Sequence, residues 1–530
     1  MLTPDIWNIY KQSERGKNAI ALFNLGENPE YDKIQEIADY METKHGDFPS
    51  DYNSNRFITF EVNVSCMETP LKSDATREDF EQFITNFDIV DYSVDEKGEL
   101  QFHEDRVLLP YNRYREKNSW MQFLSMALYI NNPSLYKPMF HISHFPLIMR
   151  NCDVLGIELP PIPRTKDYIQ YMMYYWDISQ VWNEFQKENS LTDAELCACI
   201  YDFAPMLAKP TNPTELPNPT NVWLVGAAPG DFKYLDSLGA EIGENPEQIW
   251  QCNEKTKRGD IIVIYCRSPR SYIHSVWRAN SDGIFNPFDY YQCRTTVCDG
   301  ILVPKITIKE LRSDAYLSQI PIVRKNLQGV NGVELSPKDY YEIQRYIKGR
   351  GDSINMFPKL FETNAMDFGE IKIEKDVEEK ILIPILHRLG YSDSDYTRQL
   401  SQKAGRGLKA IPDFVFLPQG EKHFASAPLV IEAKLDMSPM AERINAFSQC
   451  LSYARMLRSK LMAICDKERL VVFAVDANGS ADRNNPVFEE HWTNIYTNEL
   501  IGAKLNQLIG KEVMLKNHKI LATTPKKIEL

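Results

Sequence analysis

"IPDFVFLPQGEKHFASAPLVIEAK", residues 411–434, contains two short apolar runs with charged residues at the outer end of each. The runs "DFVFL" and "PLVIEAK" are rich in β-branched and aromatic residues, which is typical of strands, and the polar loop between them predicts a hairpin. Glu432 and Lys434 are two residues apart, so they project from one face of the second strand. Asp413 begins the first strand and can reach that face. The sequence therefore predicts two carboxylates and an ammonium group at one end of a buried hairpin.

The chemistry of this predicted group favours a divalent metal. Burying two carboxylates together is costly unless a cation or protons neutralise them. Ligation by oxygen alone favours Mg²⁺, so Asp413 and Glu432 are predicted to bind Mg²⁺ or Mn²⁺. Lys434 can orient or deprotonate a water molecule and offset charge on a phosphate. These groups suit metal-assisted hydrolysis of a phosphodiester. The same short pattern also arises by chance at exposed strand ends, so its neighbours in the sequence matter.

Two predicted helices flank the hairpin and carry further polar candidates. Upstream, "EKDVEEKILIPILHRLGY" (374–391) has the apolar spacing of an amphipathic helix. Its apolar face comprises Val377, Ile381, Ile385 and Leu389. Glu374 and Glu378 are four residues apart and lie toward that same side, and the sequence leaves open which of them joins the site. Downstream, a second helix carries Gln449 and Tyr453, again four residues apart.

A basic segment, "RQLSQKAGRGLK" (398–409), separates the first helix from Asp413. Its cationic side chains are Arg398, Lys403, Arg406 and Lys409. They are suited to lining a path for phosphate groups, because phosphate contacts depend on local positive charge. A solvated loop is the alternative interpretation, and the residues alone do not separate the two.

The ordered set of a helix acid, Pro412-Asp413, Glu432-Ala433-Lys434 and a following Gln449 with Tyr453 resembles the PD-(D/E)xK nuclease superfamily. More narrowly, it is similar to the N-terminal nuclease domain of type I restriction enzyme R subunits. The resemblance implies that the acids bind Mg²⁺, that Lys434 is catalytic, and that Gln449 and Tyr453 support the site or the DNA. It departs from type I enzymes because the sequence has no GxxxxGK[ST] motif, so cutting coupled to translocation is not implied.

The middle of the chain resembles the EVE domain, a PUA-like β-barrel, over residues 221–347. The matching stretches are "NVWLVGAAPGDF" (221–232), "RGDIIVIYCRSPRSYIHSVWRA" (258–279) and "ITIKELRSDAYLSQIPIVRKNLQGV" (306–330). The resemblance implies a pocket of aromatic side chains that holds a flipped, modified base. Extruding a base costs a few kcal/mol, which aromatic stacking can recover. The candidate base-binding residues are Trp223, Trp250, Tyr265 and Trp277; the alternative for each is packing in the core.

Length and composition predict a multidomain α+β protein. A chain of 530 residues with 43% apolar and 25% charged residues is expected to form several globular domains. The proline-rich segment 209–221 is the clearest linker, and 348–370 is a weaker boundary. We expect a mostly helical domain of unknown role over residues 1–208, with its aromatic helices packed as a core. A PUA-like (EVE) β-barrel at 221–347 and an α/β nuclease core at 371–530 follow.

Net charge and cysteine usage indicate which surface properties and which cellular compartment to expect. The net charge of −13 argues against a surface coated in nucleic-acid-binding groups, although it allows a local basic groove. The ten cysteines are scattered and form no CxxC pair, which favours reduced thiols in a cytoplasm. No apolar run is long enough to span a bilayer, and the N-terminus lacks an export pattern. We therefore expect a cytoplasmic protein without membrane contact.

These observations predict a modification-dependent DNA endonuclease of prokaryotic antiviral defence. The middle domain is expected to recognise a modified base, and the C-terminal domain to cut with Mg²⁺. A homodimer is expected because cutting both strands needs two active centres. Two alternatives stay open: a non-catalytic nucleic-acid or nucleotide-ligand sensor on a nuclease-like fold, and an RNA-directed nuclease. The modification and its sequence context are not predicted.

Overall fold

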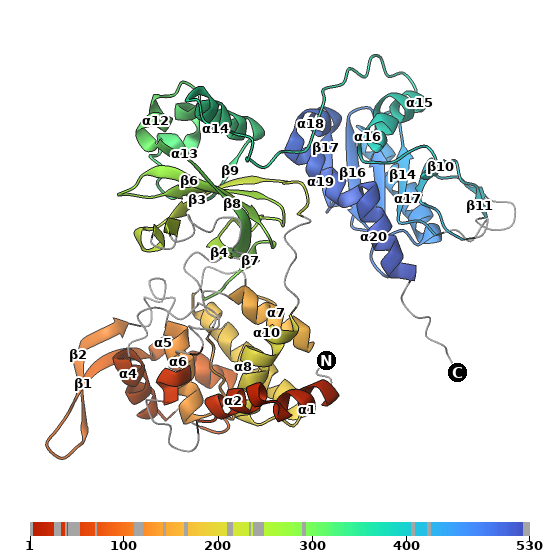
Figure 1. The fold of residues 1–530 in the computed structure, drawn as a ribbon. Coiled ribbons are helices and arrows are strands. Elements are labelled where there is room, and N and C mark those ends of the chain that lie inside the picture. The colour runs from red at the N-terminus through yellow and green to blue at the C-terminus, as the bar shows by residue number, and fades with distance from the viewer. Residues whose placement is uncertain are drawn as a thin grey trace, which may run out of the picture.

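A computed structural model shows a multidomain α+β protein with three parts (Figure 1). A helical N-terminal part lies below a sheet-rich middle part, and the C-terminal part lies beside the middle one. The structure describes residues 4–25, 33–37, 40, 54–68, 72–110, 120–140, 145–163, 168–208, 216–232, 235–236, 248–288, 293–403, 409–420 and 426–522. Within these residues, we find no helix with the length and apolar character that a membrane span requires.

The N-terminal part is built mainly from helices around an aromatic core. Its helices are α1 (Pro4–Gln12), α2 (Glu14–Phe23), α4 (Ser54–Ser65), α5 (Arg77–Asn86), α6 (Trp120–Asn131), α7 (Phe145–Leu155), α8 (Tyr168–Glu188), α9 (Asp193–Ala198) and α10 (Ala204–Leu207), with a π-helical turn at Cys199–Phe203. Strands β1 (Asp88–Val94) and β2 (Leu100–Pro110) form an antiparallel hairpin. The large aromatic side chains of the predicted helices are buried, including Tyr174, Tyr175, Trp182 and Tyr201. The expected aromatic core is therefore confirmed.

The middle part is a sheet that curls into a half-barrel. Its strands are β3 (Val222–Ala227), β4 (Gln248–Gln251), β5 (Ile261–Cys266), β6 (Tyr272–Ala279), β7 (Ile284–Phe285), β8 (Cys293–Thr307) and β9 (Asn331–Leu335). The described strands follow the order β4-β8-β6-β5-β3-β9, with β7 paired to β8. β3 and β5 run parallel, and the other pairs are antiparallel. Helices α12 (Ile308–Ser313), α13 (Pro321–Arg324) and α14 (Pro337–Gly349) supply part of the covering layer.

The C-terminal part is a mixed sheet between helices. The described strands are β10 (Tyr396–Arg398), β13 (Phe414–Phe416), β14 (Leu429–Ala433), β15 (Leu461–Cys465), β16 (Arg469–Ala474) and β17 (Phe488–His491), in that spatial order, with β11 (Gln402–Lys403) and β12 (Lys409–Ala410) paired separately. The helices are α15 (Glu374–Asp376), a π-helical segment (Val377–Leu382), α16 (Ile383–Arg388), α17 (Met440–Leu457), α18 (Trp492–Thr497), α19 (Glu499–Ile509) and α20 (Lys511–Ala522). β14 and β15 are parallel and are connected through α17.

The predicted hairpin and both predicted flanking helices are confirmed. β13 pairs antiparallel with β14, and Phe414 lies opposite Ile431. Alternate residues of β14 face different layers: Ile431 packs in the cluster that includes the helix before the hairpin, whereas Val430 packs in the cluster that includes α17. One detail differs from a regular amphipathic helix, because the turn at 377–382 is π-helical. Such turns often occur at functional sites.

Candidate active site

The register of the hairpin brings the two predicted metal ligands together. Carrying the pairing of Phe414 with Ile431 one residue further puts Asp413 opposite Glu432. Side chains directly opposite each other in an antiparallel pair lie on the same face. The backbone N–H of Ala433 donates a hydrogen bond of 2.9 Å to Oδ2 of Asp413, which fixes that carboxylate against the end of β14. The two carboxylates therefore share one face at one end of the sheet.

Glu432 is buried with only half of its carboxylate satisfied. Its side chain is 1% exposed, and Oε1 accepts a hydrogen bond of 2.7 Å from Nζ of Lys434. The other oxygen, Oε2, is buried and has no hydrogen-bond partner among the described residues. Burial and the charge of Asp413 raise the pKa of Glu432 to about 7, against the opposing effects of Lys434 and of the backbone N–H of Asp413. A buried oxygen in this state needs a proton or a cation.

The nearby carboxylates also change the pKa values of Asp413 and Lys434. Burial raises the pKa of Asp413, and the negative charges of Glu378 and Glu374 add to this, while Ala433 N–H and Lys434 oppose it. Burial by itself lowers the pKa of Lys434, but its contact with Glu432 and the nearby carboxylates raise that pKa overall. Lys434 is therefore an ammonium group that donates hydrogen bonds. It is not a ready base in this arrangement.

Both helix glutamates lie close enough to act on Asp413, but their surroundings differ. Glu378 is 12% exposed and forms an ion pair with Arg398. Glu374 is exposed at the start of α15. Arg398 also lies 3.8 Å from Glu379 and stacks over the ring of Phe414, 5.4 Å from its centroid. The arrangement makes Glu378 the more firmly positioned of the two glutamates.

The ion pair of Arg398 with Glu378 differs from the sequence-based expectation that Arg398 lines a phosphate path. Nothing local in the sequence indicated this pair, because β10 brings Arg398 to the helix only through the tertiary fold. Arg406 lies outside the described residues, and the side chains of Lys403 and Lys409 are outside them too. The phosphate path therefore stays a prediction for those three residues.

Gln449 and Tyr453 are brought together on α17. Nε2 of Gln449 donates a hydrogen bond of 3.0 Å to the hydroxyl of Tyr453, and both side chains are half-buried. Between them in the helix, Cys450 is fully buried, and the charges of Glu432 and Asp413 help to raise the pKa of its thiol after the larger effect of burial. α17 therefore covers the face of the sheet that carries the two carboxylates.

The donors of this site fit a hard divalent cation in part. Within the described residues, no group of three or more His, Cys, Asp and Glu side chains is placed to hold a metal ion. Asp413 and Glu432 still supply two carboxylates, and Oε2 of Glu432, which has no partner in the part of the chain that the structure describes, is a position that a cation would satisfy. Mg²⁺ is usually bound by one or two carboxylates, with water and substrate oxygens completing its shell. The donor set matches that requirement.

A cavity of about 230 Å³ opens beside the segment that follows Lys434. It is lined by Met437, Ser438, Met440, Arg443, Asp466 and Arg469. Met437 and Asp466 follow the carboxyl ends of the parallel strands β14 and β15, which is where ligands bind in many α/β sheets. The two arginines both contact Glu489, Arg443 through two hydrogen bonds of 3.0 and 2.8 Å.

The aromatic candidates of the middle part fall into two separate clusters. Trp223, Trp250 and Trp277 share one buried cluster, and Tyr265 lies in the other. The indole of Trp277 lies against Gly300 and fills the space that a Cβ atom would take there. The structure thus brings three of the four candidates together and does not bring Tyr265 to them. Their role in binding a base stays a prediction.

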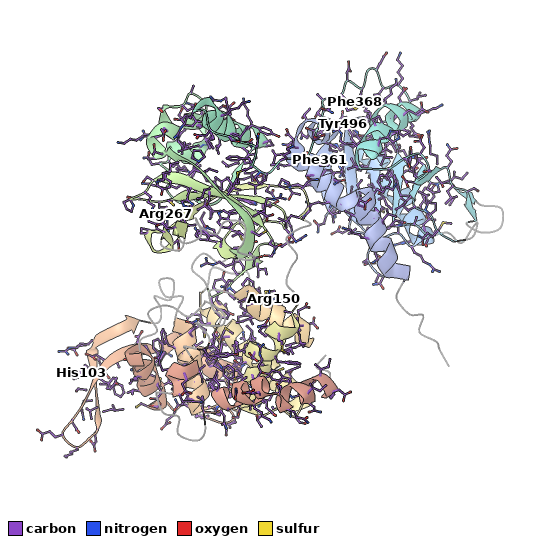
Figure 2. All side chains as sticks on the ribbon, in the orientation of Figure 1. His103, Arg150, Arg267, Phe361, Phe368 and Tyr496 are labelled. Atoms are coloured by element: carbon purple, nitrogen blue, oxygen red, sulfur yellow. The ribbon has the colours of Figure 1, made fainter. Side chains whose placement is uncertain are left out.

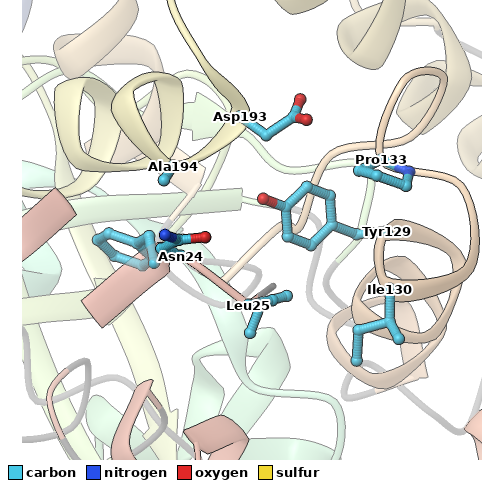
Figure 3. Close-up of a pocket in the computed structure, with 8 residues that line it drawn as sticks. Asn24, Leu25, Tyr129, Ile130, Pro133, Asp193 and Ala194 are labelled. Carbon is cyan, nitrogen blue, oxygen red and sulfur yellow. The ribbon is translucent and has the colours of Figure 1, made fainter. Parts of the chain in front are cut away.

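A second cavity, of about 220 Å³, lies in the N-terminal part, with Tyr129 and Asp193 on its wall (Figure 3). Asp193 accepts a hydrogen bond of 2.6 Å from Nζ of Lys137, which is 1% exposed. That ammonium group also donates to the carbonyl of Pro133. These contacts tie the start of α9 to the segment after α6, so we interpret the polar groups here as part of the fold and assign them no reaction.

Comparison with known proteins adds little to this geometry. No protein-family model matches the chain, and no curated protein matches it. Among solved structures, the chain is similar to the NMR structure of Rpa0253 from Rhodopseudomonas palustris. That match has 13% identity, covers 24% of this chain and 93% of the other, and has a TM-score of 0.20. A likeness at that TM-score carries no argument about fold or function.

Proposed function

We propose that the protein is a Mg²⁺-dependent, modification-dependent DNA endonuclease whose C-terminal part is a PD-(D/E)xK nuclease domain. The observation that carries the proposal is the state of Glu432. Its carboxylate is buried beside Asp413 and Lys434, and one of its oxygens has no hydrogen-bond partner among the described residues. A carboxylate that served only the fold would have its oxygens satisfied. The state of Glu432 therefore supports a cation site here.

The residues of the site divide the work of phosphodiester hydrolysis. Asp413 and Glu432 would hold the metal, which when bound supplies Lewis-acid activation of water and charge stabilisation. Lys434, as an ammonium group, would donate to a phosphate oxygen and offset the charge that develops on it. Arg398 holds Glu378 in place next to this group. The Gln449–Tyr453 pair would orient the site or contact the DNA.

For the middle part we propose a PUA-like base-binding domain. The support is the cluster of three tryptophans, since indole faces stack on any base. Their exposures are 1% for Trp223, 6% for Trp250 and 3% for Trp277, so binding requires part of the cluster to open. If Trp223→Phe and Trp250→Ala leave the affinity for modified DNA unchanged, this role is contradicted and the indoles serve only the core.

The test of the nuclease is incubation of the full chain with Mg²⁺ and duplex DNA that is either plain or cytosine-modified. We expect cutting of the modified duplex, loss of cutting in EDTA, and loss of cutting in Lys434→Ala. Lys467→Ala is the matched control, because Lys467 makes an ion pair of 2.8 Å with Asp436 outside the carboxylate group. Cutting that survives in Lys434→Ala would remove the assigned site. Equal cutting of both duplexes would remove the modification dependence.

One observation favours a second candidate, a non-catalytic nucleic-acid sensor on the same fold. The ion pair of Lys434 with Glu432 already neutralises part of the buried charge without a metal. A sensor would bind modified DNA or RNA in the assay above but cut neither with Mg²⁺ nor with Mn²⁺. Including an RNA substrate also distinguishes an RNA-directed nuclease.

A further inference from the structure

Helix α19 belongs to two hydrophobic cores at once. Leu500 is 5% exposed and packs in the cluster formed by the helices and strands of the middle part, which includes Tyr340 and Ile343 of α14. Leu505 and Ile509, further along the same helix, are buried in the C-terminal cluster. One helix therefore contributes side chains to the interior of both parts. In Figure 1, α19 lies in the C-terminal part, on the side of the middle part.

The connecting segment, residues 350–373, packs along this junction. Its side chains Phe357 and Leu360 are buried in the middle cluster. The ring of Phe361 lies against Gly502 of α19, where a Cβ atom would come 3.0 Å from Cδ1, and Figure 2 labels Phe361 between the two parts. Phe368 then packs edge-on against Tyr496, with ring centroids 5.1 Å apart. These four side chains lie within the predicted weak boundary 348–370, so that stretch packs against both parts.

Polar contacts reinforce the same junction from two further places. The hydroxyl of Tyr341 on α14 donates a hydrogen bond of 3.3 Å to Glu499 at the start of α19. Nε2 of Gln507 donates one of 2.6 Å to the carbonyl of Asn218, in the segment before β3. Because these contacts lie at different points along α19, they oppose both rotation and sliding of one part against the other.

We propose that α19 and the connecting segment hold the middle and C-terminal parts as one rigid unit, which sets the distance between a base bound by the first and a phosphate cut by the second. Parts of a chain that meet through small polar interfaces move relative to each other by default. A shared apolar core removes that freedom. The second half of this inference rests on the proposed function, whereas the rigidity does not.

The experiment on DNA maps the cut positions around a single modified cytosine in a long duplex. The wild-type chain should cut within a narrow window, and Leu500→Ala should widen the spread of distances about twofold or more because it loosens the junction. Leu508→Ala, the same change on the same helix but packed only against the C-terminal cluster, should keep the narrow window. If the wild-type cuts are already scattered, the inference is wrong, although the nuclease proposal stands.

A second measurement tests the rigidity without any activity. Two labels, one in the middle part and one in the C-terminal part of the full chain, report the distribution of distances between them by energy transfer. We expect a narrow distribution for the wild type and a broader one for Leu500→Ala, which removes a side chain of α19 from the middle cluster. Tyr341→Phe/Gln507→Ala removes only two hydrogen bonds and leaves the apolar contacts intact, so it should broaden the distribution less. A broad wild-type distribution would overturn the inference. A narrow one with no cutting of any DNA would contradict the nuclease proposal alone.

Discussion

Two carboxylates, Asp260 in the middle part and Glu432 in the C-terminal part, are both buried, and they differ in the hydrogen bonds that stabilise them. Asp260 is fully buried, and each of its oxygens accepts three hydrogen bonds, from the backbone and side chains of Thr220 and Asn221, from the indole of Trp223 and from the backbone of Lys257. Glu432 is equally buried, but its carboxylate interacts only with the ammonium of Lys434 and the backbone N–H of Asp413 among the described residues, and Oε2 has no hydrogen-bond partner there.

On the proposed function, the difference separates a group that serves the fold from one that would bind a cation. The donors around Asp260 replace the water that it loses on folding, so its charge is stabilised without any further partner. Glu432 has fewer such donors within the described residues. Proteins tolerate such deficits mainly at functional sites, where a ligand completes the set.

The largest effect should come from Glu432→Gln. The amide keeps the shape of the side chain but cannot supply a carboxylate to the metal. We expect the rate of DNA cutting to fall by about 10³-fold, which corresponds to about 4 kcal/mol of barrier. Because a buried charge is removed, the free energy of unfolding should stay equal or rise. Calorimetric titration with Mg²⁺ should show weakened binding. Normal binding and cutting would return Glu432 to a purely structural role.

Asp260→Asn should give the opposite pattern. Replacing one acceptor oxygen by an NH₂ group sets donors against donors inside the core, and we expect a loss of about 3 kcal/mol in the free energy of unfolding. Mg²⁺ binding in the C-terminal part should change little at low temperature. Urea unfolding and calorimetric titration with Mg²⁺ at matched folded fraction check both points. A variant as stable as the wild type would mean that the six hydrogen bonds contribute little.

The raised pKa of Glu432 predicts a pH dependence of stability. Its pKa is about 7 in the folded chain and 4.5 ordinarily, so the folded state holds the proton more tightly. Protonated Glu432 therefore contributes fully to the free energy of unfolding below pH 4.5. This contribution, up to about 3 kcal/mol, is lost as the pH rises to about 7. In EDTA, the difference in unfolding free energy between the wild type and Glu432→Gln should change over this pH range and stay constant above it. A constant difference would contradict the shift.

The smallest of these effects should come from Arg398→Ala. Without its guanidinium partner, Glu378 loses its fixed position and its negative charge acts more strongly on Asp413. We expect about a tenfold loss of cutting, or about 1.4 kcal/mol, and a pH optimum displaced upward. Arg398→Lys should restore much of the rate because it keeps the charge. If both variants behave as wild type, the ion pair has no part in the site.

Some features of the candidate site follow from the local sequence pattern, and others do not. The strands 414–416 and 429–433 follow from β-branched and aromatic runs, and the placement of Asp413 and Glu432 on one face follows from the two-residue period of a strand. The helix before the hairpin follows from its apolar spacing. By contrast, the ion pair of Arg398 with Glu378 joins residues 20 apart through the fold, and no period predicts it.

Sequence alone determined the local elements of this protein and the identity of its candidate groups, because strand and helix periods assign each side chain to a face without knowledge of the rest. Only the tertiary structure decided which groups are satisfied and which are not. It completed the hydrogen bonds of Asp260, left Oε2 of Glu432 without a partner among the described residues, separated Tyr265 from the tryptophans and placed α19 in two cores. The burial of a side chain and its hydrogen-bond partners depend on residues that are far apart in the sequence. They are therefore defined only once the chain has folded.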